Sequence, residues 1–150
     1  MSAKAQVIHT AMSRSPGWHL SVPAVVVPPG PLMFIQGQAA LGAEWSDPIP
    51  AEQGFSTTPD IVVVGETVAE QSDQIFKNLI AVLGEAGGDL SNIVHMIIFL
   101  TDMERFLDFF EVRKRYYPDG VYPPATGVEV TRLADPRLFI EVHATAALGS

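Results

Sequence analysis

The sequence predicts an α+β domain in which a mostly antiparallel sheet carries two helices on one face. Three observations lead to this prediction. Two segments begin with a helix-capping pattern and continue with apolar residues at helical spacing. Between them, the apolar stretch 93–100 is too short for an independent helix and fits a strand that is covered on both faces. Near the C-terminus, residues 138–145 alternate in the two-residue period of a strand.

The N-terminal part predicts two short strands, Gln6–His9 and Leu32–Gln36, the second of which follows a proline-rich turn. Residues 39–60 then form a long polar stretch with two isolated aromatic residues, Trp45 and Phe55. A loop of this length in a compact domain is usually functional or mobile. Its aromatic side chains either close over a binding site as a lid or pack locally within the loop.

The first helix is predicted from the capping box at Thr67–Glu70, in which the threonine side chain accepts from the amide of the glutamate. Glycines at 84, 87 and 88 predict its end. The apolar residues that recur at helical spacing, and that we expect on its buried face, are Val68, Ile75, Phe76, Leu79, Ile80 and Leu83.

A second capping box, Thr101–Glu104, predicts a second helix that ends before Pro118. Its expected stripe carries Phe106, Leu107 and Phe110, with Arg113 as a further candidate. The cations of 113–115 are expected on a solvated face near the helix C-terminus, where positive charge complements the helix dipole.

Two strands are predicted to follow, Gly127–Leu133 and Leu138–Thr145, joined by a turn at 134–137. Glu141 occupies an interior position of the last strand, with apolar neighbours on both sides. Such a carboxylate is either exposed on an open sheet face or held in a pocket by hydrogen-bond donors. His143 points the same way as Glu141 and is its candidate hydrogen-bonding partner.

The composition is that of one domain covering residues 1–150, without a linker or an internal repeat. Hydrophobic residues make up 47% of the chain and the mean hydropathy is +0.22, more than a small monomer can hide, so we expect an oligomer. Seventeen acidic against nine basic residues give a formal charge of -8. That charge repels phosphate backbones, and no basic stripe opposes it, so no nucleic-acid partner is expected.

Several other classes of site are disfavoured. The chain has no cysteine, which excludes disulfides and thiolate chemistry and fits a cytoplasmic location. No apolar run approaches 18 residues, so no membrane association is expected. The histidines lie far apart in the sequence and no cofactor motif is present, so neither a metal nor a cofactor is expected. His95, within an apolar strand, is interpreted as a core or interface histidine.

Four segments point to a known family by their order and spacing. Glu70–Leu79 looks like the central helix of the Rid (reactive intermediate deaminase, YjgF-type) family, and Phe99–Met103 looks like the strand end that follows it. Gly37 and Gln38 match the family's Ser-Gly-Gln strand end, and Ile140–Ala144 resembles its Ile-Glu-Ile-Glu-Ala strand. The likeness extends from about residue 24 to residue 146.

The resemblance implies a chorismate-mutase-like α+β fold and a homotrimer with sheets inside, helices outside and ligand clefts between subunits. It also implies that Glu141 lies in such a cleft and helps to hold a water molecule or a small-molecule substrate.

The chain departs from the family where deaminases bind the substrate carboxylate. Family deaminases have Pro-Ala-Arg before the penultimate strand, and the arginine holds the carboxylate in a bidentate fork. Counting from the strand places Ala125 at the arginine position, and the family's helix asparagine falls on Phe110. Arg132 or Arg137 could replace the arginine by reaching across a subunit boundary. The cleft is therefore expected to suit a neutral or aromatic ligand.

Two functional hypotheses remain open. In the first, the chain is an enzyme for hydrolysis, deamination or tautomerisation of an imine, enamine or enol without strong carboxylate recognition. Glu141, alone or with His143 or Gln36, is then the acid/base or water-orienting group. In the second, it is a non-catalytic trimer that binds a small ligand or a partner in the same cleft. The expected ligand-binding residues are Gln36, Gly37, Gln38, Phe110, Ala125, Thr126, Phe139 and His143.

Overall fold

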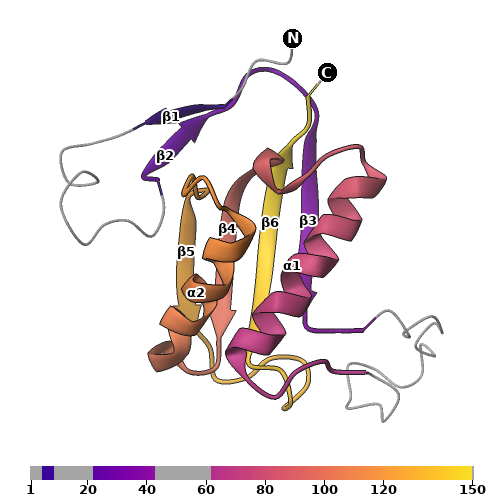
Figure 1. Cartoon of the computed structure of the whole chain (residues 1–150), viewed down its shortest axis with the longest axis vertical. Coiled ribbons are helices and arrows are strands. Elements are labelled where there is room, and N and C mark those ends of the chain that lie inside the picture. The colour runs from indigo at the N-terminus through magenta and orange to yellow at the C-terminus, as the bar shows by residue number, and fades with distance from the viewer. Residues whose placement is uncertain (1–4, 9–21, 43–61, 150) are drawn as a thin grey trace.

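A computed structural model of the chain describes residues 5–8, 22–42 and 62–149. It has two layers, a four-stranded sheet and two α-helices that cover one face of the sheet (Figure 1). The strands are β1 (Gln6–Ile8), β2 (Ala24–Val26), β3 (Leu32–Ala39), β4 (Ile93–Leu100), β5 (Ala125–Glu129) and β6 (Ile140–Ala147). The helices are α1 (Val68–Glu85) and α2 (Phe106–Tyr116), with short 3-10 turns η2 (Leu90–Asn92) and η3 (Met103–Arg105). Trp45 and Phe55 lie outside the described residues, so the structure does not test the expected lid.

The strand order in the sheet is β3-β6-β4-β5. β6 is antiparallel to both of its neighbours, β3 and β4, whereas β4 and β5 are parallel. The predicted α+β class, with a mixed and mostly antiparallel sheet and both helices on one face, is confirmed. β1 and β2 pair with each other in a separate hairpin near the two chain ends (Figure 1). β2 was not predicted, because three residues are too few to show the alternation of apolar and polar side chains in a strand.

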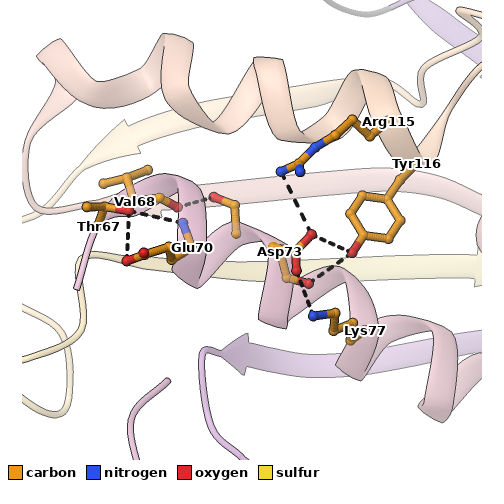
Figure 2. A network of polar contacts seen from close by, with 8 residues as sticks. Thr67, Val68, Glu70, Asp73, Lys77, Arg115 and Tyr116 are labelled. Carbon is orange, nitrogen blue, oxygen red and sulfur yellow. Dashed lines mark hydrogen bonds and ion pairs between the residues drawn. The ribbon is translucent and has the colours of Figure 1, made fainter. Parts of the chain in front are cut away.

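The predicted capping box is present at the N-terminus of α1, and its glutamate reaches back to the residue before the cap, Glu66. The Thr67 side chain accepts from the Glu70 N–H at 3.2 Å (Figure 2), and the Glu70 carboxylate accepts from the Glu66 N–H at 2.8 Å. The bond from the Glu66 N–H, followed by the bond from the Thr67 hydroxyl, lowers the pKa of Glu70. On the expected buried face of α1, Ile80 is 45% exposed, and the other five apolar residues are buried.

The second helix begins later than its capping box predicted. Asp102, not Thr101, is the cap, and it opens the 3-10 turn η3 before α2 starts at Phe106. Thr101 instead continues the sheet, since its N–H donates to the Phe139 carbonyl at 3.0 Å. The turn changes the helical phase, so Leu107 is 66% exposed and its expected burial is wrong. The buried residues of α2 are Phe109, Phe110, Val112 and Arg113.

Arg113 corrects the expectation of a solvated cationic face, because its side chain is 1% exposed. The guanidinium carbon lies 4.4 Å from the ring centroid of Phe110 and 4.3 Å from that of Tyr122. A cation held over aromatic faces gains electrostatic attraction that partly offsets its lost hydration. Burial nevertheless lowers the pKa of Arg113 to about 10.

Polar contacts also join the two helices. The Tyr116 hydroxyl of α2 donates to the Asp73 carboxylate of α1 at 2.8 Å, and Lys77 contacts the other oxygen of that carboxylate at 2.7 Å (Figure 2). The hydrogen bond from Lys77 is the main reason that the pKa of Asp73 is lowered. Burial and the bond to Asp73 raise the pKa of Tyr116 to about 12.

A buried glutamine links α1 to the turn that leads into β6. The Gln71 side chain is 0% exposed, and its amide nitrogen donates to the carbonyls of Arg137 at 2.7 Å and Gly65 at 3.1 Å. Its amide oxygen accepts from the Phe139 N–H at 2.8 Å. This side chain therefore satisfies three backbone groups where β6 begins.

The predicted two-faced pattern of the last strand is confirmed within β6. Ile140, Val142, Ala144 and Ala146 are buried under the helices. The alternate positions, which include Glu141, therefore lie on the opposite face, which we call the open face of the sheet. In β5, Gly127 lies on the helix side, because a Cβ there would come within 2.3 Å of the Phe106 ring. Among the described residues, neither helix is long and apolar enough for a membrane span.

Candidate functional site on the open face of the sheet

Glu141 and His143 form a pair on the open face. The Glu141 Oε1 and His143 Nε2 atoms are 3.2 Å apart, and the two side chains are 23% and 47% exposed. The His143 ring also meets the Phe99 ring of β4 edge-on, with centroids 5.1 Å apart and planes 67° apart. The imidazole is thus held from two sides, by a carboxylate on its own strand and by an aromatic ring on the neighbouring strand.

A glycine in β3 gives this pair its space. The register between β3 and β6 shifts by one residue between Ile35 and Gln38, so Gln36 and Gly37 lie opposite the single residue His143. A Cβ at Gly37 would lie 2.0 Å from the Glu141 Oε1 and 2.7 Å from the His143 Nε2. Any other side chain at Gly37 would therefore displace the pair. β-Bulges are over-represented beside active sites, where they redirect side chains.

The sheet register extends the site across all four strands. Thr126 of β5 lies in register with Ile97 of β4, which is in register with His143 of β6. Gln36 and Gly37 of β3 complete the row. Thr126 and Gln36 are exposed in the chain. A ligand that contacted this row would therefore meet polar groups from three of the four strands.

Two of the expected site residues are elsewhere. Phe110 is 5% exposed and packs against Phe106 and Arg113 on the helix side of the sheet. Within one chain Phe110 therefore does not line a site with Glu141, which corrects the expectation that it binds the ligand there. Ala125 is in register with the buried Met96 and packs against the core.

The remaining expected residues are Gln38 and Phe139. Gln38 is in register with Val142, whose side chain is buried on the helix side, and its amide donates to the Gln36 carbonyl at 3.2 Å. Phe139 precedes β6 and packs against the core, while its backbone bonds to Gln71 and Thr101.

Sequence analysis missed Phe99, the aromatic contact of His143. Every residue of β4 except His95 is apolar, so the pattern hid which positions alternate onto the open face. His95 itself is exposed in the chain, which makes its interpretation as a core residue wrong. Its role at an interface stays a prediction.

The expected substitutes for the missing cation are both in the loop between β5 and β6. Arg137 binds Asp135 through Nε at 2.9 Å and Nη2 at 2.7 Å, and its backbone N–H donates to the same carboxylate at 2.9 Å. Asp135 is only 2% exposed, and the side-chain bond from Arg137 is the main cause of its lowered pKa. The Arg137 guanidinium is therefore engaged within its own loop. Arg132 is exposed.

Neither of two surface hollows of the described chain includes the pair. They have volumes of about 560 and 530 Å³ and lie over the helices, with Ala69 and Arg115 in the lining of both. No group of three or more histidine and acidic side chains among the described residues could hold a metal ion.

Comparisons with known proteins match this architecture over nearly the whole chain. The model of the Endoribonuclease L-PSP family covers residues 23–148. The chain belongs to this family, also named Rid or YjgF. Protein DfrA of Myxococcus xanthus is 36% identical over 110 residues, which are 73% of this chain and 72% of that protein. A RutC family protein of Aquifex aeolicus is 31% identical over 71% of this chain and 79% of its own length.

Solved structures of the Rid family share the fold. The Rid protein YyfB of Yersinia pestis superposes with a TM-score of 0.78 at 22% identity, over 97% of this chain and 100% of that one. Yeast Mmf1 superposes with a TM-score of 0.61 at 21% identity, over 98% of each chain. At these identities the likeness shows the fold alone. The resemblance inferred from the sequence is thus confirmed for the family and for the fold.

Proposed function

We propose that this Rid protein is a homotrimer that converts a small imine, enamine or enol in a cleft between subunits. In this proposal the open faces of the sheets turn toward one another and the helices lie outside. Glu141 serves as the acid/base or water-orienting group, and the substrate carries no carboxylate that the protein must bind. The observation that carries the proposal is the Glu141–His143 pair, held above Gly37 on the open face.

The open face also has the apolar surface that an assembly would bury. Phe34 is 79% exposed, Leu32 49% and Val128 37%. Their chain neighbours Ile35 and Gly127 point to the helix side, so these three side chains lie on the open face. Large apolar side chains exposed on both edge strands of one sheet face, β3 and β5, are surface that an assembly could bury. Packing two further copies against it would supply the atoms that close a cleft at Glu141.

The charge pattern supports a substrate without a carboxylate. Ala125, at the position of the family arginine, offers no hydrogen-bond donor from its side chain. Arg137, one of the two candidate replacements, already binds the buried Asp135. A carboxylate-bearing substrate placed beside Glu141 would then meet like charge without a fixed cation to offset it.

A non-catalytic role in binding a small ligand or a partner is the alternative, and the same loss of the arginine position favours it. RNA cleavage, which the family description names, fits poorly with a formal charge of -8. We include in the proposal a single domain over residues 1–150 and a cytoplasmic location, noting that the related yeast protein Mmf1 is named as mitochondrial.

Light scattering on the purified chain tests the assembly. We expect a mass near three times the 16.2 kDa of one chain. Phe34→Asp should dissociate the trimer, because it places a charge in the centre of the proposed contact. Leu107→Asp is the matched control, since it changes an exposed apolar residue on the outer helix α2. A stable monomer at micromolar concentration, or equal effects of the two substitutions, would exclude this assembly.

A further inference from the structure

We propose that His143 is the residue that transfers the proton and that Glu141 positions it, so that the site catalyses tautomerisation. This inference rests on the proposed function and narrows it to one reaction. It begins with the 3.2 Å contact between the His143 Nε2 and the Glu141 Oε1. An ionised carboxylate only accepts hydrogen bonds, so Nε2 must carry the hydrogen when Glu141 is charged. In a neutral ring, the lone pair is then on Nδ1.

The surroundings fix the ring but leave that nitrogen available. Among the described residues, the one hydrogen bond of the His143 ring is the bond to Glu141. The Phe99 edge restricts rotation of the ring. Gly37 presents no side chain beside Nε2, where a Cβ would lie 2.7 Å from that atom. A carboxylate that holds one imidazole nitrogen and leaves the other for the substrate is a recurring arrangement for general-base catalysis.

The groups that face the ring come from three strands. On its own strand its neighbours are Glu141 and the uncharged Thr145. On β4, Ile97 is in register with His143, and His95 is in register with Thr145. From β3 only Gln36 and Gly37 lie opposite His143. One carboxylate and no lysine or arginine thus face the ring from these three strands.

The proposed step is balanced without a co-reactant. The Nδ1 atom of His143 takes a proton from the carbon next to an imine or carbonyl carbon. The electron pair of the broken C–H bond becomes a carbon–carbon double bond, and the π pair of the C=N or C=O bond moves to the heteroatom. That atom takes a proton from water, and the imidazolium returns its proton to water. The net result is an imine–enamine or keto–enol isomerisation.

The test uses phenylacetone, a stable ketone without a carboxylate, whose α-protons exchange with D₂O and are followed by proton NMR. We expect the wild-type protein to accelerate the exchange over buffer and His143→Gln to lose at least about 100-fold of that acceleration. Glu141→Gln should lose about 10-fold or more, because the ring is no longer held. Gly37→Ala should lose a similar factor, because its Cβ displaces both side chains. Leu107→Gln, at an exposed position on the outer helix α2, is the control and should keep the wild-type rate.

A second measurement does not depend on turnover. NMR of the protein labelled with ¹⁵N-histidine should show His143 with the hydrogen on Nε2 at high pH, and Glu141→Gln should change that signal. A hydrogen on Nδ1 would overturn the positioning role, as would a full exchange rate in His143→Gln. Wild-type protein that does not exceed the buffer rate would overturn the tautomerisation step. If Glu141→Gln alone abolished exchange, the proposed function would stand with Glu141 as the acid/base, and this inference would fail.

Discussion

Replacing Gln71 by leucine should destabilise the chain strongly while leaving the helix itself intact. The substitution keeps the side chain's size and removes three hydrogen bonds, those to the Gly65 and Arg137 carbonyls and that from the Phe139 N–H. Each contributes about 1 kcal/mol net, and a buried group left without a partner costs about 1–3 kcal/mol. Because the three hydrogen bonds are partly and not fully buried, the lower end applies. We expect a loss of about 3 kcal/mol.

For a chain of 150 residues, 1 kcal/mol corresponds to a change of roughly 2–4 °C in Tm. Gln71→Leu should therefore lower Tm by about 6–12 °C in scanning calorimetry at fixed protein concentration. Gln74→Leu is the matched control, since Gln74 is on the same helix and, among the residues that the structure describes, its amide donates to the Asn78 side chain alone, at 2.8 Å. It should cost about 1 kcal/mol or less. Equal losses in the two variants would refute the idea that Gln71 links α1 to the start of β6.

Two further predictions concern acid sensitivity and packing. The lowered pKa values of Asp73, Asp89 and Asp135 mean that their stabilising contribution is complete above the ordinary value of 3.8 and is lost as pH falls through the folded-state values. Tm should thus fall steeply below about pH 4, and Asp135→Asn should flatten that fall; an unchanged acid profile in the variant would contradict the assignment. Gly127→Val should cost about 1–3 kcal/mol in urea unfolding, because its side chain would overlap the Phe106 ring, and an unchanged urea midpoint would contradict that packing.

Local signals in the sequence were enough for the helices and for most of the sheet. The Thr67 cap and the stripe of α1 were found because capping and helical spacing are short-range effects. The predicted burial of Leu107 was wrong because a 3-10 turn shifted the phase of α2. The spacing of apolar residues does not indicate such a turn. The predicted exposure of Arg113 was wrong because its burial depends on Phe110 and on Tyr122, and Tyr122 lies beyond the helix in the chain.

The candidate site was predictable only in part. The alternation of β6 placed Glu141 and His143 on one face, and the structure shows them in contact. The role of Gly37 and the contact of Phe99 depend on the register of β3 and β4 against β6, which is set by long-range pairing and by a bulge. No pattern within a single segment carries that register. The expectation that Phe110 lines the ligand site with Glu141 was wrong within one chain for a related reason. The packing of α2 places Phe110 on the helix side of the sheet.

The most direct test of the account compares two imines that differ only in a carboxylate. An amine oxidase forms one from phenethylamine, and an amino-acid oxidase forms the other from phenylalanine; absorbance follows the disappearance of each. We expect the wild-type chain to accelerate the loss of the phenethylamine imine at least 10-fold more than that of the phenylalanine imine, and Glu141→Gln to abolish the difference. Equal acceleration of both imines, or a preference for the carboxylate-bearing one, would contradict this expectation and would show that a cation such as Arg132 takes the place of the family arginine.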